Sequence, residues 1–119
     1  MQATIFLTNL SLRVHIGVRP RERRVRQPIR IDVALEAELP GLAGGDDLSL
    51  TINYSALHDR IVAFVEASAF ALIETLARGV GALCLEDTRV AGVEVTVRKP
   101  RALPRADAAG VTIRMARNG

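Results

Sequence analysis

The stretch PIRIDVALEAEL, residues 28–39, alternates apolar and polar side chains with a period of two. Its apolar face carries Ile29, Ile31, Val33, Leu35 and Leu39, and its polar face carries Arg30, Asp32, Glu36 and Glu38. Alternation over this length is typical of an antiparallel strand that buries one face and exposes the other. The pattern therefore predicts a strand, which Pro40 and the glycine-rich residues after it bring to an end.

The same period appears in three other stretches of the chain. Residues 10–18, LSLRVHIGV, place Leu10, Leu12, Val14, Ile16 and Val18 on one face. Residues 93–97 and 110–115 alternate in the same way near the end of the sequence. The polar connection between the first two stretches, RPRERRVRQ at 19–27, is longer than the roughly two to five residues of a hairpin loop. We therefore expect four strands, with a long loop after the first.

Between the two pairs of strands, the apolar residues recur at helical spacing instead. Residues 55–68 form one such stretch, with Ser55 as the expected N-cap. Its apolar positions are Leu57, Ile61, Phe64 and Val65. Residues 70–85 form a second stretch, whose apolar stripe is Leu72, Ile73, Leu76, Val80, Leu83 and Cys84. Two helices are expected between the second and the third strand.

The order strand, strand, helix, helix, strand, strand predicts an α+β fold over residues 1–119 as a single domain. A four-stranded antiparallel sheet with both helices on one face buries the apolar sides of all six elements. Two sheet edges stay open in that arrangement, and 49% of the residues are hydrophobic, with a mean hydropathy of +0.19. Pairing of edges between subunits, closed into a ring, would cover both the edges and the apolar excess.

Composition excludes several classes of protein. No run of about 18 apolar residues appears, so we expect no membrane-spanning helix. The first residues lack the features of a signal peptide, and Cys84 is the sole cysteine, which rules out a disulfide framework and suits the cytoplasm. Neither His15 nor His58 has a second ligand at metal spacing, so no metal site is predicted. A net charge of +3 permits a nucleic-acid partner without requiring one.

Lys99 is the only lysine of the chain, while the other fifteen basic residues are arginines. Arginine cannot usefully lose its proton near neutral pH, whereas burial or a neighbouring charge can tune a lysine to do so. Pro100 follows directly and favours an extended backbone at Lys99, at the end of the predicted strand. A lone surface lysine is the alternative interpretation, and the arginine-rich background favours a functional one.

Three further side chains are candidates for chemistry. Tyr54 is the only tyrosine and stands where a loop meets a predicted helix, so its phenol could exchange a proton or merely support the loop. Glu22 is a lone acid in the arginine-rich loop 19–26, which otherwise has the composition of a solvated basic loop. Glu74 falls opposite the apolar stripe and predicts an exposed pair with Arg78. If its helix begins near residue 70, the helix dipole would instead keep Glu74 ionised.

Read together, these segments resemble the dihydroneopterin aldolase family of folate synthesis. The resemblance covers nearly the whole chain, through TIFLTNLSLRVHIGV (4–18), RERRVRQPIRIDVAL (21–35), DDLSLTINYSALHDRIVAFVEASAFALIETLA (46–77) and VTVRKPRALPRADAAGVTIRM (95–115). Four short motifs occur in the family's order: IGV…E…Q, DDL…TINY, F.LIE.LA and KP. The resemblance implies the tunnelling fold, with four subunits closing a barrel, often as two stacked rings, and active sites between neighbouring subunits.

The family's roles fall on named residues of this sequence. The resemblance implies that Glu74 binds the amino group and ring N–H of a pterin, with backbone near Ile73 and Ile52 assisting. It also implies that Tyr54 comes from the adjacent subunit, that Lys99 transfers protons, and that Glu22 helps to place Lys99 or a water. The reaction would need no metal and no Schiff base, hence no cofactor, and some epimerisation at C2′ would accompany cleavage.

Three alternatives stay open at this point. The arginines of 19–26 and the tail ALPRAD (102–107) also suit a dihydroneopterin triphosphate 2′-epimerase, because arginines bind a triphosphate well. A nucleic-acid-binding module could use the same arginines, although aromatic residues make up only 3% of the chain and leave little for base stacking. A catalytically silent subunit that completes a ring is the third.

Overall fold

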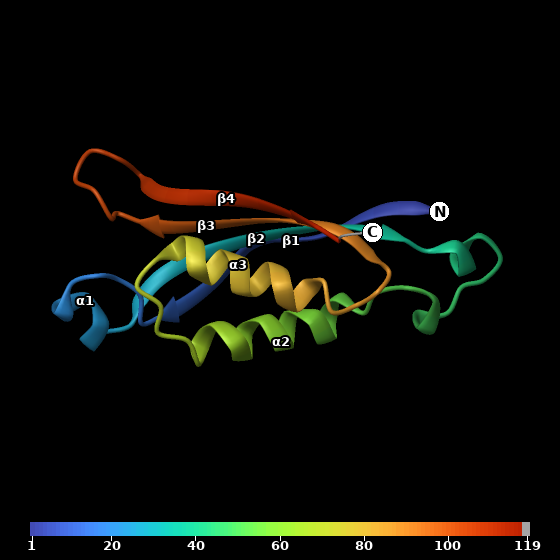
Figure 1. Ribbon diagram of the computed structural model, residues 1–119, viewed down its shortest axis with the longest axis horizontal. Coiled ribbons are helices and arrows are strands. Elements are labelled where there is room, and N and C mark those ends of the chain that lie inside the picture. Colours follow the sequence, from blue (N-terminus) through green and yellow to red (C-terminus); the bar gives the residue numbers. More distant parts are fainter. Residues whose placement is uncertain (118–119) are drawn as a thin grey trace.

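The computed structural model describes residues 1–117 as a four-stranded sheet packed against two long helices (Figure 1). The strands are β1 (Gln2–Val14), β2 (Gln27–Glu38), β3 (Val90–Pro100) and β4 (Ala108–Ala116). They lie in the order β1-β2-β3-β4, and each pairs antiparallel with the next. The long helices α2 (Tyr54–Glu66) and α3 (Ile73–Cys84) connect β2 to β3.

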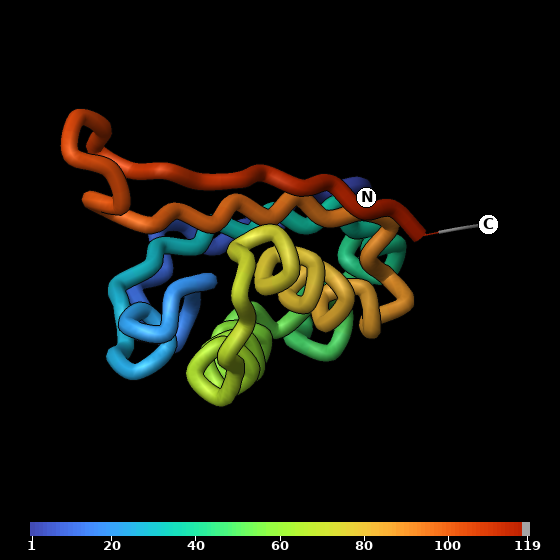
Figure 2. Tube along the Cα trace, turned by 60° about the vertical axis from the view of Figure 1, so that its left-hand side comes forward, coloured from blue at the N-terminus to red at the C-terminus, as the bar shows by residue number. Residues whose placement is uncertain are grey.

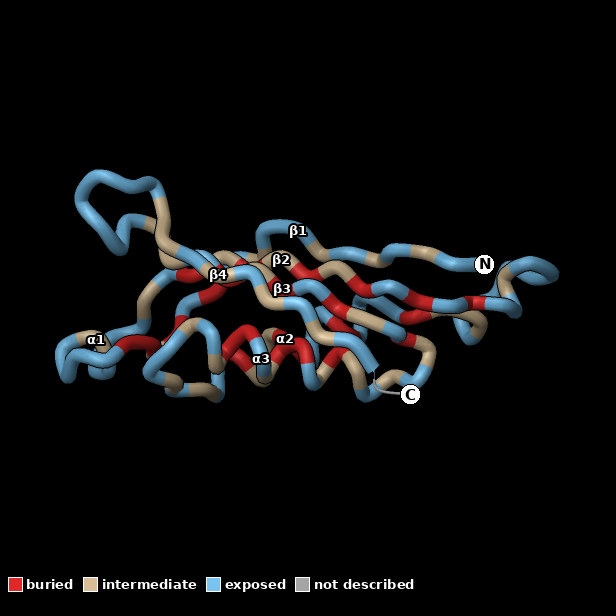
Figure 3. Tube along the Cα trace, turned by 45° about the horizontal axis from the view of Figure 1, so that its top comes forward, coloured by how far each residue is buried: buried red, intermediate tan, exposed pale blue. Residues whose placement is uncertain are grey.

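Both long helices lie on the same side of the sheet (Figure 2). The core fills the space between the two layers, and Figure 3 shows buried residues recurring along β2 and β3 and along both long helices. Its largest fully buried side chains are Ile16, Ile29, Ile31, Leu35, Leu39, Ile61, Leu76, Val14, Val33, Val65, Val80 and Val90. The predicted four-stranded ββααββ fold with two helices on one face is confirmed.

The first strand differs from the prediction at both ends. It begins at Gln2, eight residues before Leu10, because a shift of register between Leu7 and Leu10 hides the early alternation. Asn9 adopts a positive φ of 57° at this shift, and its N–H donates to Asp32 Oδ1 at 2.6 Å. The strand ends at Val14, so the expectation that it runs on to Val18 is wrong. Gly17 instead donates its N–H to the Phe70 carbonyl, 3.2 Å away.

The helix boundaries also correct the prediction. Asn53, and not Ser55, is the N-cap of α2, because its Oδ1 accepts the N–H groups of Ser55 and Ala56 at 3.1 Å each. The second helix begins at Ile73, so Leu72 is the N-cap residue and is 47% exposed instead of belonging to the buried stripe. The polar connection 19–27 contains a short helix, α1 (Pro20–Arg24).

The other side of the sheet carries polar residues, and no helix of residues 1–117 covers it. Arg98 pairs with Asp32 at 2.6 Å on this side, and Arg114 pairs with Glu94 at 3.0 Å. Arg98 therefore points away from the helices, as its place beside Lys99 in a strand predicts. The two 3-10 turns, η1 (Pro40–Ala43) and η2 (Leu48–Leu50), lie in the connection between β2 and α2. Within residues 1–117, no helix is long and apolar enough to cross a membrane.

Candidate active site

Lys99 and Glu22 meet although 77 residues separate them in sequence. Lys99 is the penultimate residue of β3, and its Nζ donates a hydrogen bond to Glu22 Oε2 across 3.0 Å. The lysine side chain is 19% exposed and the glutamate side chain 28% exposed, so both are partly shielded from solvent. The only lysine of the chain therefore lies in a specific ion pair and not free on the surface.

Gly17 makes room for Glu22. Its φ of +140° is a backbone conformation that residues other than glycine rarely adopt. A Cβ atom at this position would lie 2.5 Å from Glu22 Cβ and 2.8 Å from Glu22 Oε1. Any larger residue would therefore push the carboxylate away from Lys99. Sequence reasoning used Gly17 only as part of the IGV motif and missed this requirement.

Two further contacts fix the Glu22 loop. Glu22 Oε1 accepts the N–H of Arg19 at 3.2 Å, while Oε2 takes the lysine. Gln27, at the start of β2, donates from Nε2 to the Ile16 carbonyl at 2.6 Å and to the Glu22 carbonyl at 3.3 Å. The hydrogen bond from Lys99, and after it the one from Arg19, lowers the pKa of Glu22 below its ordinary value of 4.5. Glu22 is therefore a carboxylate at neutral pH.

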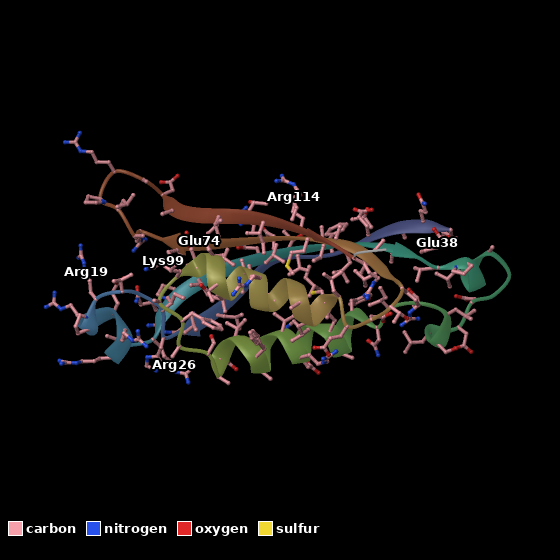
Figure 4. The ribbon with its side chains drawn as sticks, in the orientation of Figure 1. Arg19, Arg26, Glu38, Glu74, Lys99 and Arg114 are labelled. Atoms are coloured by element: carbon pink, nitrogen blue, oxygen red, sulfur yellow. The ribbon has the colours of Figure 1, made fainter. Side chains whose placement is uncertain are left out.

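A hollow of about 210 Å³ opens beside this ion pair. Its lining residues are Ile16, Gly17, Val18, Glu22, Ala71, Leu72, Ile73, Glu74 and Lys99. Glu74 lies in the first turn of α3, where the helix dipole favours a carboxylate. Figure 4 shows Glu74 and Lys99 at the same end of the molecule, next to α1. We call Glu22, Ile73, Glu74 and Lys99 the Lys99 cluster.

The predicted pair between Glu74 and Arg78 does not form. Both side chains are exposed, and none of the ion pairs within residues 1–117 joins them. Since α3 begins only at Ile73, Glu74 lies at the end of the helix that faces the hollow, instead of in the middle of a solvent-exposed face. Its carboxylate is thus available to a ligand in the hollow.

Ile52 and Tyr54 lie elsewhere in the same chain. Ile52 is 5% exposed and lines a separate hollow of about 180 Å³ with Asn53, whereas the Tyr54 side chain is 63% exposed. In Figure 1, α2 begins at its green end, at the opposite end of the helical layer from α1. Its 13 residues span about 20 Å at 1.5 Å per residue. We call Ile52, Asn53 and Tyr54 the Tyr54 cluster.

A bidentate ion pair lies next to the Tyr54 cluster and was missed by sequence reasoning. Arg89 donates to both carboxylate oxygens of Asp87, at 3.0 and 2.7 Å, and to the Thr51 carbonyl at 2.7 Å. Asp87 and Arg89 stand two residues apart in a turn, and nothing in their spacing connects them with Thr51. Only the fold reveals that they meet the segment before Tyr54.

The arginines of the 19–26 loop flank Glu22 in sequence, at the same end of the molecule as the Lys99 hollow. All five are exposed, namely Arg19, Arg21, Arg23, Arg24 and Arg26. Among the ion pairs within residues 1–117, none involves any of them. Arg19 and Arg26 are labelled at this end of the molecule in Figure 4. Arg23 and Arg26 donate to the backbone carbonyls of Ala69 and Arg13, so this end of the molecule carries a concentration of exposed positive charge.

The Lys99 cluster combines groups suited to proton transfer and to ring recognition. An amine held by a carboxylate can exchange protons with a bound molecule or a water. A second carboxylate, Glu74, can accept two parallel N–H bonds from a flat ring edge. Within residues 1–117, no group of three or more His, Cys, Asp or Glu side chains is placed to hold a metal ion.

Comparison with known proteins finds similar chains among dihydroneopterin aldolases and a related epimerase. The family described as dihydroneopterin aldolase (FolB) matches residues 5–114. The dihydroneopterin aldolase of Streptomyces coelicolor is 38% identical over 98 residues, which cover 82% of each chain. The dihydroneopterin triphosphate 2′-epimerase of Escherichia coli is 32% identical over 111 residues, covering 93% of this chain and 92% of that protein.

Solved structures agree with the sequence relatives. The E. coli dihydroneopterin aldolase in complex with neopterin superimposes with a TM-score of 0.89 at 29% identity, covering 96% of this chain and 99% of that one. A uricase from Bacillus fastidious superimposes with a TM-score of 0.64 at 16% identity, covering 99% of this chain and 48% of that one, which is a likeness of fold alone. The predicted tunnelling fold is confirmed by these two likenesses.

Proposed function

The chain belongs to the dihydroneopterin aldolase family, and from that membership we propose how its residues carry the reaction. The enzyme is a lyase of folate synthesis, which cleaves the side chain of 7,8-dihydroneopterin and releases 6-hydroxymethyl-7,8-dihydropterin and glycolaldehyde. The observation that carries the assignment of roles is the hydrogen bond from Lys99 to Glu22 in a hollow that also contains Glu74.

Glu74 is the proposed anchor of the pterin ring. A pterin presents an exocyclic amino group and a ring N–H side by side, and a carboxylate accepts both in parallel. Ile73 adds backbone at the start of α3, and the apolar side chains of Val18 and Leu72 line the same hollow. In this orientation the side chain of the substrate extends toward Lys99. The neopterin bound to the E. coli relative is a ligand of the same class.

Lys99 is the proposed proton carrier of the cleavage. A base removes the proton of the 2′-hydroxyl, the C1′–C2′ bond breaks, and its electron pair moves through C1′ into the C6=N5 imine of the substrate. Glycolaldehyde leaves, and a proton then added to C1′ completes the hydroxymethyl product. Since the Lys99 side chain is 19% exposed, a water can reach its amine and relay these protons. Glu22 fixes the position of that amine.

Tyr54 and Ile52 are proposed to join the Lys99 cluster from a neighbouring copy. Strands β1 and β4 leave two open sheet edges, and pairing β1 of one copy with β4 of the next would close a ring, which we propose to be a tetramer or two stacked tetramers. Val18 and Leu72 are exposed beside the Lys99 cluster. Tyr54 itself and the nearby Leu48 are exposed at the Tyr54 cluster. Burying these two sets together would complete one active site at every interface. We propose the cytoplasm as the setting, since the lone thiol of Cys84 suits a reducing compartment.

Incubation with 7,8-dihydroneopterin tests the function. We expect glycolaldehyde and 6-hydroxymethyl-7,8-dihydropterin in equal amounts, identified by chromatography and mass spectrometry. A protein that binds the substrate and releases neither product would contradict the aldolase assignment. Chromatography on a diol-resolving phase would also detect the C2′ epimer, which forms when glycolaldehyde is recaptured on its other face.

A second candidate function is epimerisation of dihydroneopterin triphosphate. The five exposed arginines of the loop that carries Glu22 favour it, because guanidinium groups bind phosphates well. The E. coli epimerase is also about as similar to this chain as the E. coli aldolase, at 32% and 30% identity. Comparing kcat/KM for dihydroneopterin and for its triphosphate separates the two. A preference for the triphosphate with a C2′-inverted product would make epimerisation the main activity.

A further inference from the structure

We propose that Arg89 and Asp87 are positioning residues of the active site, which hold the Tyr54 cluster in the place where a neighbouring copy needs it. This inference rests on the proposed function, because it takes Ile52 and Tyr54 as part of a site shared between copies. Arg89 does not reach the Lys99 cluster. It acts through the backbone of Thr51, the residue directly before Ile52.

The contacts of Arg89 form a bridge between the sheet and the Tyr54 cluster. One edge of its guanidinium donates from Nε and Nη2 to the two oxygens of Asp87, which fixes the plane of the group. The remaining nitrogen, Nη1, donates to the Thr51 carbonyl at 2.7 Å. Thr51 itself donates its N–H to the Leu48 carbonyl at 3.2 Å. The chain that leads into α2 is therefore held at a defined distance from the start of β3.

Arg117 anchors the turn from which Arg89 and Asp87 project. It follows the last residue of β4 and donates to the carbonyls of Leu85, Asp87 and Val90, the last two at 3.0 and 3.1 Å. The N–H of Val90 also donates to the Asp87 carbonyl at 3.0 Å. The turn between α3 and β3 is thus held to the sheet at several points. The Asp87 carboxylate therefore has a fixed position from which it orients Arg89.

The charges of the pair support the same interpretation. The hydrogen bonds from Arg89 lower the pKa of Asp87, and Asp87 in turn raises the pKa of Arg89. Both side chains are about a third exposed, so the pair lies at the surface of the hollow and not in the core. Surface ion pairs contribute little to stability. We therefore infer that the role of Arg89 is its hydrogen bond from Nη1 to the Thr51 carbonyl, and not a contribution to the stability of the core.

The start of α2 does not depend on Arg89 for its formation. Asn53 caps the helix by itself, and the buried residues Leu57, Ile61 and Val65 dock it on the sheet. The two hydrogen bonds of Asn53 fix the first turn of the helix, but they do not fix the position of residues 51 and 52 relative to the sheet. Arg89 supplies that contact, which a lysine could not reproduce because it lacks the planar fork.

Steady-state kinetics of Arg89→Lys provide the first test. We expect KM for 7,8-dihydroneopterin to rise about tenfold while kcat changes less than about threefold, because backbone near Ile52 is proposed to bind the ring. The control is Arg60→Ala. Like Arg89, Arg60 lines the hollow of about 180 Å³ beside Ile52, and it pairs with Glu86 at 2.6 Å. Equal kinetics for Arg89→Lys and wild type would overturn the proposal.

Hybrid assemblies provide the second test and separate positioning from folding. Arg89→Ala and Lys99→Arg chains are co-expressed with different affinity tags, and assemblies that contain both are purified. A site that takes Lys99 from the Arg89→Ala chain and the Tyr54 cluster from the Lys99→Arg chain contains only wild-type residues. Random mixing makes about a quarter of all sites of this kind. We expect activity at low substrate concentration to exceed the mean of the two pure variants several-fold.

The pair Tyr54→Phe with Lys99→Arg is the control for the shared site itself. If that control pair regains activity on mixing and the Arg89→Ala pair does not, Arg89 acts on folding or on its own Lys99 cluster, and the inference fails alone. If neither pair regains activity while the KM of Arg89→Lys is unchanged, both the shared site and the inference fail. Regained activity in both pairs supports both.

Discussion

The Lys99 cluster and the Tyr54 cluster are built in opposite ways. In the first, contacts within one chain already hold the functional groups, since Glu22 is bound by Lys99 and by the N–H of Arg19. In the second, the backbone is fixed by Asn53 and Arg89, but the phenol of Tyr54 is 63% exposed. The Lys99–Glu22 pair is therefore fixed within one chain, and we propose that the exposed Tyr54 phenol is presented to a neighbouring copy.

Strand β3 sets the distance between these two regions. Arg89 stands directly before it and Lys99 lies near its end, so ten residues at about 3.3 Å each separate them by roughly 30 Å. No side chain bridges that distance. Under the proposed function the two clusters therefore cooperate across an interface between copies, and variants in the two regions should differ in the kinetic constant that they change.

The largest expected effect on the presented side comes from Tyr54→Phe. Removing the hydroxyl should lower kcat about 10²-fold if the phenol takes part in proton transfer. The melting temperature should stay within about 2 °C of the wild type, because an exposed surface substitution costs little stability. Kinetics with 7,8-dihydroneopterin and calorimetry measure the two quantities. Loss of stability together with normal turnover would remove Tyr54 from the mechanism.

Gly17→Ala tests the self-contained side. The added Cβ would lie 2.5 Å from Glu22 Cβ at a φ of +140°, so we expect a loss of about 1–3 kcal/mol in the free energy of unfolding. Turnover should fall as well, because the carboxylate that holds Lys99 is displaced. Gly44→Ala is the matched control, since nothing lies within 4 Å of a Cβ built there. Equal denaturation midpoints for the two variants would contradict this account of Gly17.

The smallest expected effect is a dependence of stability on acid. The pKa of Glu22 is lower in the folded chain than its ordinary 4.5, so its contribution to stability is complete above that value and is lost as pH falls through the folded pKa. Urea unfolding of wild type and Glu22→Gln should thus differ by a constant amount near neutral pH. The difference should shrink below about pH 4.5. A gap that stays constant down to pH 3 would disprove the lowered pKa.

Periodicity predicted the fold because most strands and helices bury one clean face. It failed where a single residue breaks the pattern, as at Asn9, whose positive φ shifts the register of β1. It also extended the strand beyond Val14, since Ile16 continues the alternation and is buried, although the chain has already left the sheet. Local spacing cannot distinguish a buried loop residue from a buried strand residue.

Sequence composition singled out three of the candidate site residues. Lys99 and Tyr54 are each unique in the chain, and Glu22 is the one acid in a basic loop. Arg89 had no such signal among fifteen arginines, and its partner Thr51 lies 38 residues away. Periodicity alone predicted a surface pair of Glu74 with Arg78, because it gives the face of a helix and not the hollow at its end; only the family resemblance implied a ligand-binding role for Glu74.

Turnover by Lys99→Arg tests the central claim most directly, namely that the proton of this amine, and not its charge, is what the reaction uses. Neopterin binding by fluorescence titration and product formation from 7,8-dihydroneopterin are measured on the same preparation, with Arg105→Lys as an exposed control exchange in the other direction. The account predicts unchanged neopterin affinity and a kcat lower by about 10²–10⁴-fold for Lys99→Arg. Near-normal turnover by that variant would contradict it.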